Sequence, residues 1–293
     1  MKKNSKNITI ILINCTLLVL CIIYSNQFFK EFIHYSNLFL EKVFPSTFTL
    51  LIISNILLDY QIIHYIQILF KNKSPYIYLL IMSMISGFPS GTIYIKEMLE
   101  KKIISKEMAN QMIQYASFPN PLFLINISSI VLNSKILSIK LLFSIFISNI
   151  LIFIKIPKEN YIITNQIENI NFTNSLKTSI SKAINSIILI YGSSIFFSLI
   201  AFFLTKIISN NIYSYVLING IFDLTKGITS SSILPNTTLK YYFILLLISL
   251  NPITIHMQTK SILEDTSISY KKYLTGRITS TILSFIISIL IIR

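Results

Sequence analysis

Long apolar runs alternate with short polar segments along almost the whole chain. The runs cover 8–24, 47–70, 76–95, 121–132, 136–156, 187–208, 241–250 and 278–292. Several approach or exceed the roughly 18 to 20 residues that an α-helix needs to cross a bilayer. Because backbone groups in lipid must be hydrogen-bonded within their own segment, the pattern predicts an all-α, polytopic integral membrane protein. We expect about eight transmembrane helices of this kind.

The most polar stretch lies in the middle of the chain, at 156–181. It carries Pro157, several Asn and Ser residues, and charges of both signs. This composition is typical of a linker. We therefore expect an N-terminal membrane half over 1–160, a polar linker over 161–182 and a C-terminal membrane half over 183–293. Residues 175–186 are compatible with an amphipathic helix that leads into the next span.

Four polar or proline-containing segments interrupt the apolar sequence, at 87–92, 117–121, 219–227 and 251–258. Proline removes a backbone donor and glycine lets the backbone unwind. In lipid the freed groups are tolerated only where protein or a water-filled cavity satisfies them. The N-termini of the resulting half-helices then present N–H groups to an anion. These segments predict a substrate site, while plain kinks and surface loops remain the other interpretation.

Two of the four segments match each other in sequence. The segment ISGFPSGTIYIKEMLEKKIISKEM at 85–108 is similar to ISLNPITIHMQTKSILEDTSISYK at 248–271. Aligning Ile85 with Ile248 also aligns Pro89 with Pro252, since 248 − 85 and 252 − 89 are both 163. Duplicated, broken membrane segments are typical of transporters built from structural repeats. The pattern predicts two repeat-related halves, although Ile and Ser are abundant enough for coincidence to compete.

The residues predicted to bind substrate come from these segments. They are Gly87, Pro89, Ser90, Gly91, Thr92, Asn120, Asp223, Lys226, Asn251, Pro252, His256 and Gln258. His256 is either a structural histidine or part of a polar pocket. Lys226 pairs with Asp223, faces an anionic substrate, or lies in a solvated loop. The intramembrane carboxyl of Asp59 is either functional or an anchor at a helix end.

Composition and charge agree with a membrane protein. Hydrophobic residues make up 53% of the chain and charged residues 12%, against about 25% charged in soluble domains. Mean hydropathy is +0.68. The net charge of +14 comes mostly from lysines between apolar runs, which favours loops at the cytoplasmic membrane surface over nucleic-acid binding. Both charged hairpins, 96–106 and 260–272, are basic, so the positive-inside rule and an inverted repeat predict different topologies.

Motifs of soluble enzymes are missing from the chain. We find no phosphate-binding loop, dinucleotide fingerprint, HExxH, GxSxG or CxxC in the sequence. Cys15 and Cys21 lie in the first apolar run with a spacing that fits neither a zinc site nor a redox motif. We expect no enzyme activity, no metal and no cofactor. The expected partners are the lipid bilayer and a small anionic substrate, and association with further copies of the chain stays open.

The first broken segment also resembles a known family. The block ISGFPSGTIYIKEMLEKKIISKEMANQMIQYASFPNPLFLI at 85–125 is similar to the core of the YlbJ-like sporulation integral membrane proteins. These are grouped with nucleoside-recognition Gate domains and are distantly similar to concentrative nucleoside transporters. Weaker family-like pieces are VFPS at 43–46, GIFDLTKGI at 220–228 and ITIHMQ at 253–258. The resemblance runs from about residue 40 to the end of the chain, and only 86–123 is specific.

The resemblance implies a sporulation carrier in a bacterial membrane, the outer forespore membrane, that moves dipicolinic acid from mother cell to forespore. The chain departs from the family pattern at four places. It has Asn251-Pro252 where the family has a glycine pair, Asp223 for Glu, Lys226 for Asn, and lacks a second proline after Pro45. A carrier for a nucleoside-like solute and a non-transporting membrane morphogenesis or scaffold protein are the alternative functions.

Overall fold

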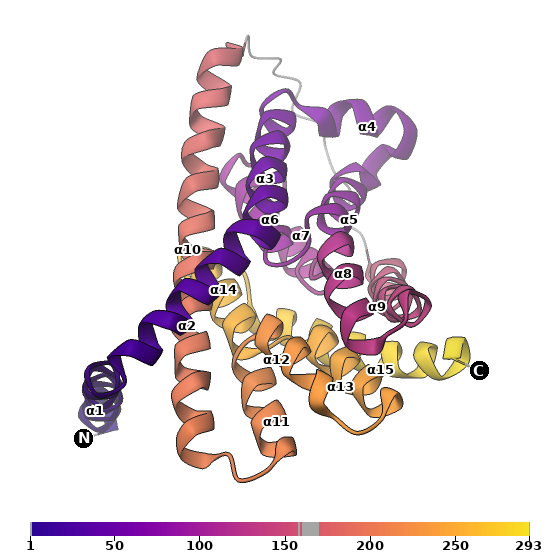
Figure 1. The fold of residues 1–293 in the computed structure, drawn as a ribbon. Helices are drawn as coiled ribbons and strands as arrows, with labels where there is room; N and C mark the ends of the chain where they lie inside the picture. The colour runs from indigo at the N-terminus through magenta and orange to yellow at the C-terminus, as the bar shows by residue number, and fades with distance from the viewer. Residues whose placement is uncertain (1, 158, 160–169, 293) are drawn as a thin grey trace.

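The protein, described here by a computed structural model over residues 2–157, 159 and 170–292, consists of helices and short connections (Figure 1), with no β-strand among those residues. The all-α prediction is confirmed for this part of the chain. Four helical segments are long and apolar enough to cross a membrane: α9 (Lys135–Lys155), α10 (Phe172–Ile208), the broken pair α13–α14 (Thr237–Leu263) and α15 (Tyr270–Ile292). Two bent helix pairs raise the number to six if each is one span.

Eight spans are therefore not confirmed, because the chain divides or shortens several apolar runs. The run at 76–95 is split between α5 (Ser74–Ser86) and α6 (Ser90–Glu100), and the run at 121–132 forms only α8 (Pro121–Leu132). At 1.5 Å per residue, helices of this size are about 20 Å long or less. The hydrocarbon core of a bilayer is about 30 Å thick, so each of these helices alone is too short to span it.

The N-terminal region contains the two bent pairs. α1 (Lys2–Ile23) and α2 (Ser25–Leu38) meet at an angle of 100°, and α3 (Phe44–Asp59) and α4 (Ile62–Phe70) meet at 76°. The π-helical segment η1 (Phe39–Val43) joins α2 to α3. α2 crosses obliquely in front of α10 and packs against it (Figure 1).

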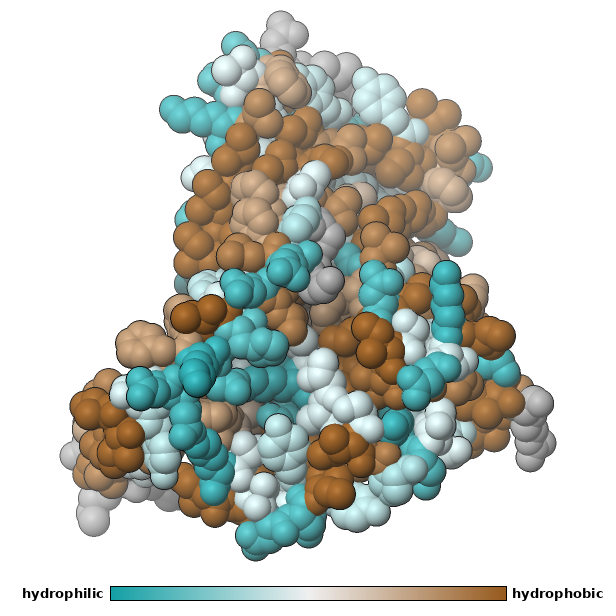
Figure 2. Space-filling view, viewed as in Figure 1, coloured by the Kyte–Doolittle hydropathy of each residue, from teal (hydrophilic) through white to brown (hydrophobic). Residues whose placement is uncertain are grey.

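The outer surface shows where lipid contact is expected. In Figure 2, apolar side chains gather over the part of the visible face where Figure 1 places α3 and α10, and hydrophilic side chains gather along α2. Ile22, Ile68 and Leu290 are 76%, 77% and 69% exposed. Extensive exposure of large apolar side chains marks a surface that contacts lipid or protein rather than water. An integral membrane protein is therefore consistent with the folded surface.

The predicted linker is only partly described. Residues 161–169 lie outside the described residues, whereas 172–182 form the beginning of α10. Asn171 starts this 37-residue helix, since its side chain accepts a hydrogen bond from Thr173 N at 2.9 Å. The polar residues after 172 therefore lie on the same helix as the apolar residues at 187–208.

The remaining helices place two breaks where the sequence predicts them. α5 ends at Gly87 and α6 begins after Pro89, while α13 (Thr237–Leu250) ends at Asn251 and α14 (Ile253–Leu263) begins after Pro252. α6 and α14 each contain 11 residues and pack against each other. The other elements are η2 (Lys71–Lys73), α7 (Lys106–Met112), α11 (Ile212–Phe222), α12 (Leu224–Ser230) and η3 (Ser231–Ile233).

The apolar core has two parts that do not follow the predicted halves. One part packs α3, α5, α6 and α7 with residues of α10, and the other packs α8 and α9 with α12 and α13. The second part therefore joins helices from both sides of the polar stretch. α9 and α15 also lie side by side. The broken pair α5–α6 packs in the first part, α13 packs in the second, and α14 contributes residues to both.

Candidate functional site

A cavity lies where the broken segments meet. It has a volume of about 630 Å³, counted with its open mouth. Its walls come from the N-terminal region, the first break, the starts of α8, α12 and α14, and the middle of α10. The lining residues are Tyr35, Phe39, Val43, Thr47, Ser86, Phe88, Pro89, Asn120, Phe123, Ile190, Ser194, Asp223, Leu224, Thr225, Thr254, Ile255 and Gln258.

Four helix N-termini border this cavity. Pro89, Asn120 and Asp223 are the residues that precede α6, α8 and α12, and each lines the cavity. Thr254, the second residue of α14, lines it as well. The first N–H groups of a helix have no partner within the helix and carry a partial positive charge. The cavity is therefore surrounded by the positive ends of four helices.

Two of these N-termini are capped by side chains and two are not. Asn120 Oδ1 accepts from Phe123 N at 3.1 Å, and Asp223 Oδ1 accepts from Lys226 N at 2.9 Å. Pro89 and Pro252, the N-cap residues of α6 and α14, have no side chain that caps the helix. Of the four helix starts at the cavity, the two at the proline breaks thus lack a side-chain cap, and such starts favour an anion.

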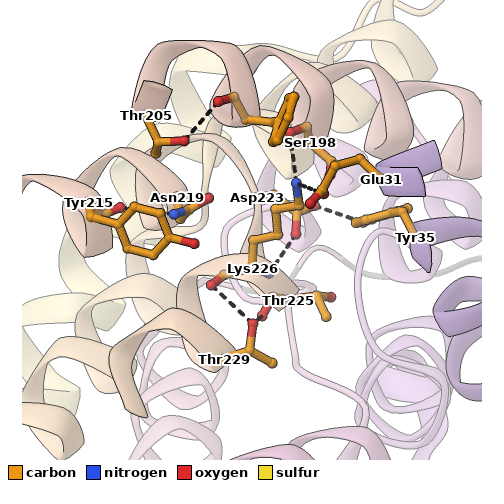
Figure 3. A network of polar contacts seen from close by, with 11 residues as sticks. Glu31, Tyr35, Ser198, Thr205, Tyr215, Asn219, Asp223, Thr225, Lys226 and Thr229 are labelled. Carbon is orange, nitrogen blue, oxygen red and sulfur yellow. Dashed lines mark hydrogen bonds and ion pairs between the residues drawn. The ribbon is translucent and has the colours of Figure 1, made fainter. Parts of the chain in front are cut away.

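Asp223 supplies a carboxylate to the cavity wall. It is 2% exposed, and its Oδ2 accepts a hydrogen bond from the Tyr35 hydroxyl at 2.8 Å (Figure 3). The carboxylate therefore has two donors, one from α2 and one from the backbone of α12. Both stabilise its negative charge in a buried position. Tyr35 lies in α2, outside the broken segments that the sequence singled out.

The Lys226 side chain does not line the cavity. Its Nζ lies 2.7 Å from Glu31 Oε2 and donates to Ser198 O at 3.1 Å (Figure 3). Only its backbone N–H contacts Asp223. Lys226 therefore neither forms a side-chain ion pair with Asp223 nor lies in a solvated loop. The ammonium group instead ties α12 to α2 and α10.

The first break packs directly on the segment 116–120. A Cβ atom added to Gly87 would lie 2.5 Å from Asn120 N, and one on Gly91 would lie 2.1 Å from Ala116 O. Phe88 N donates to Phe118 O at 2.6 Å. Both glycines are therefore required for close approach of two backbones. This contact places Phe88 and Asn120 on the same cavity wall.

A buried guanidinium group holds the same segment from the other side. Arg277 of α15 donates to Ser117 O at 3.0 Å, Asn149 Oδ1 at 2.9 Å and Gln114 O at 3.3 Å. Asn149 of α9 also donates to Ser117 O at 3.1 Å. These bonds satisfy carbonyl groups of a non-helical segment that would otherwise be buried without partners. They support the first break without reaching the cavity.

The second break is held by side-chain hydrogen bonds. Asn251 Nδ2 donates to Ser117 Oγ at 2.9 Å and to the Tyr273 hydroxyl at 2.7 Å. His256 bonds the Tyr270 hydroxyl through Nδ1 at 2.8 Å and Leu250 O through Nε2 at 3.0 Å. Both ring nitrogens are thus occupied, which matches the structural interpretation of this histidine.

The structure brings some of the predicted site residues to the cavity and leaves others beside it. Pro89, Asn120, Asp223 and Gln258 line the cavity. Gly87, Ser90, Gly91, Thr92, Lys226, Asn251, Pro252 and His256 are not among the lining residues. Gln258 donates to Ile190 O at 3.2 Å and Ser194 Oγ at 3.0 Å, so it joins α14 to α10.

Several lining residues were not predicted individually. Phe88 and Thr254 lie inside the broken segments that the sequence singled out, and the Thr254 hydroxyl donates to Phe222 O. Tyr35, Thr47 and Ser194 come from helices outside those segments. Asp59, the other carboxyl considered, lies outside the cavity lining and pairs with Lys101. It is the last residue of α3, and the ion pair joins this helix end to the end of α6.

Comparison of the chain with known protein families, curated proteins and solved structures finds no match. The resemblance to the YlbJ-like proteins consequently stays a prediction from the segment 86–123.

Proposed function

We propose that the protein is a membrane carrier that moves a small solute through the cavity at the broken helices. The observation that carries the proposal is the convergence of four helix N-termini on one cavity in a chain with several long apolar helices. Non-helical backbone deep in a membrane protein is stable only when it is buried or lines a water-filled space. Broken helices of this kind bind solutes in several transporter folds.

The solute we propose is a small anion with a planar ring, dipicolinic acid in the first place. The start of α14, which has no side-chain cap, provides N–H groups for a carboxylate. At the start of α6, Ser90 N and Thr92 N already donate to Gly87 O and Pro89 O, which leaves Gly91 N for the same role. Phe88, Phe123 and Tyr35 supply aromatic faces for a ring. Sporulation, the outer forespore membrane and transport from mother cell to forespore rest on the family resemblance alone.

A nucleoside-like solute is the second candidate, and the charge of the lining favours it. No Lys, Arg or His is among the described residues that line the cavity, whereas the Asp223 carboxylate is. An uncharged ring with hydroxyl and amino groups would pair with Asp223, Asn120 and Gln258 without electrostatic repulsion. The two candidates thus differ in the charge that the cavity must accept.

Uptake into liposomes tests the proposal. Purified protein is reconstituted, and the entry of labelled dipicolinate and of labelled nucleosides is measured against protein-free liposomes. Entry of dipicolinate that unlabelled dipicolinate inhibits supports the first candidate, and entry of nucleosides supports the second. The carrier proposal is wrong if neither solute enters, if Asn120→Ala leaves sporulation unchanged, and if substitutions of loop lysines impair sporulation. A scaffold protein is then the better account.

A further inference from the structure

A second buried carboxyl lies outside the solute cavity, two turns into α6. Glu97 is 4% exposed, and its Oε2 has no hydrogen-bond partner among the described residues. A carboxylate oxygen that is buried without a donor is costly, because burial removes the water that would stabilise its charge. Such a group is stable when it binds a proton or a cation.

The nearest polar neighbour is Asn55 of α3, whose side chain adjoins the Glu97 carboxyl. Asn55 Nδ2 donates to Leu51 O at 3.1 Å, which fixes the orientation of the amide. Its Oδ1 is then left buried and without a partner. The Asn55 amide favours the charged carboxyl group, whereas the burial of Glu97 opposes that charge. Two buried acceptors, Glu97 Oε2 and Asn55 Oδ1, nevertheless have no donor among the described residues, and a proton on the carboxyl group would supply one.

Glu97 is reached from a second cavity. This cavity has a volume of about 900 Å³, counted with its open mouth, and lies between α6, α10 and α14. The solute cavity, the one lined by Asp223 and Gln258, is bordered by the same three segments. The second cavity lies about one to two helical turns away from it; on α14, for example, Gln258 lines the solute cavity and Ser261 lines the second cavity. Water in the second cavity can therefore deliver a proton to Glu97 without passing through the solute cavity.

The charges around Glu97 favour a proton over a metal ion. Within the described part of the chain, no group of three or more His, Cys, Asp or Glu side chains is placed to hold a metal. Lysines of α10 and of the end of α6 act on the carboxyl electrostatically and repel a second cation. The titratable groups that face Glu97 or share its cavity are Lys182, Lys101, Lys96, Glu100, Asp265, Tyr78 and Tyr94.

We propose that Glu97 is a proton-binding site, with Asn55 as the partner of the protonated carboxyl group. A proton from water in the second cavity forms an O–H bond on Oε2, and the same water receives it on release, with no other bond made or broken. When Glu97 loses the proton, its contact with Asn55 loses the hydrogen bond that joins α6 to α3. The site itself does not depend on the proposed transport. Only a pH dependence of solute entry, caused by protonation of Glu97 in α6, would require the proposed transport.

Infrared difference spectroscopy of the full-length protein in liposomes tests the site. Spectra at low and high pH report the carbonyl stretch of a protonated carboxyl group. We expect a band that disappears as the pH rises in the wild type, is lost in Glu97→Gln and remains in Glu100→Gln, whose carboxyl lines the same cavity. A band that persists in Glu97→Gln, or the same midpoint for Glu97 as for an exposed carboxyl, overturns the proposal.

A second variant covers the case in which Glu97→Gln does not fold. Asn55→Leu removes the acceptor but keeps the carboxyl group, so the band should remain, shift in frequency and titrate at a different pH. An unchanged band in Asn55→Leu contradicts the assigned partner. Addition of Na⁺ at constant pH should leave the band unchanged, and its loss on addition of Na⁺ would show a sodium site instead. Because none of these readouts uses solute entry, a failure here is distinguishable from a failure of the carrier proposal.

Discussion

The two proline breaks end their first helices in the same backbone conformation with different residues. α5 ends at Gly87 with φ 81°, and α13 ends at Asn251 with φ 69°. With ψ angles of 175° and 140°, both residues lie outside the left-handed helical region, in a conformation that glycine adopts freely and other residues rarely adopt. At both breaks, a residue with a positive φ angle therefore ends the first helix.

The surroundings explain why the two residues differ. At the first break, the backbone of Asn120 occupies the space that a Cβ atom on Gly87 would need. At the second break there is room for a side chain, and Asn251 uses it to bond Ser117 and Tyr273. The first break is thus held by close backbone packing, and the second by hydrogen bonds. Substitutions should affect them by different mechanisms.

The largest effect is expected for Gly87→Ala. The new Cβ atom clashes with backbone, which cannot move as a side chain can, and φ 81° strains any L-residue. We expect a loss of about 3 kcal/mol or more in stability, measured by thermal unfolding in detergent with circular dichroism. Gly192→Ala is the matched control, because a Cβ atom on Gly192 of α10 meets nothing within 4 Å. Equal unfolding of the two variants would contradict the packing account.

Asn251→Gly should have the next largest effect. Glycine keeps the backbone conformation but loses both hydrogen bonds, which we expect to lower the stability by about 2 kcal/mol. Asn133→Gly is the control, since Asn133 also ends a helix, α8, with φ 50°, and its side chain is exposed. The control should be neutral in the same unfolding experiment. If both variants lose stability equally, the side-chain bonds of Asn251 do not hold the second break.

Substitutions of two N-cap residues distinguish an effect on stability from an effect on solute binding. Asn120→Ala removes the cap of α8 and an amide from the cavity, and Asn236→Ala removes the cap of α13 at a position that does not line the cavity. Each should lose about 1 kcal/mol of stability. Only Asn120→Ala should lower solute entry into liposomes, by about tenfold if its contact is worth 1.4 kcal/mol. Equal entry in both variants would argue against a cavity role for Asn120.

The smallest effect is expected for Asp223→Asn, which distinguishes the two solute candidates. Asparagine keeps one oxygen, which can cap α12, and replaces the oxygen that accepts from Tyr35 with an NH₂ group that donates to the Tyr35 hydroxyl instead, so the substitution removes the negative charge. Entry of an anion should rise about threefold, the effect of removing a repulsion of about 0.6 kcal/mol. Entry of a nucleoside-like solute should fall, because a charged acceptor is lost. Tyr35→Phe, which keeps the charge, is the control in the same uptake assay.

The sequence predicts the breaks better than it predicts their neighbours. Proline and glycine act on their own backbone, so Pro89 and Pro252 mark helix starts whatever packs around them. The partner of Gly87 is 33 positions away, at Asn120, and no local pattern reveals such a contact. Lys226 illustrates the same limit. Its pairing with Glu31 depends on how α2 crosses α10 and α12, whereas proximity in sequence pointed to Asp223.

The number of spans was predicted less well for a related reason. Hydropathy measures how apolar a run is, and the run at 76–95 is apolar on both sides of Gly87. Gly87 and Pro89 divide this run into two short helices, and hydropathy does not register such a break. A count based on apolar runs therefore exceeds a count based on helices long enough to span. Tyr35 lines the cavity from α2, which packs against α10, and hydropathy does not encode that contact either.

The central claim is that the two proline breaks open the starts of α6 and α14 onto one solute cavity. A structure of the protein determined with bound dipicolinate tests it most directly. The account predicts a carboxylate of the ligand at the start of α6 or α14 and its ring between Phe88 and Phe123. Dipicolinate bound in the second cavity beside Glu97, or an empty solute cavity in protein that binds dipicolinate in solution, would contradict it.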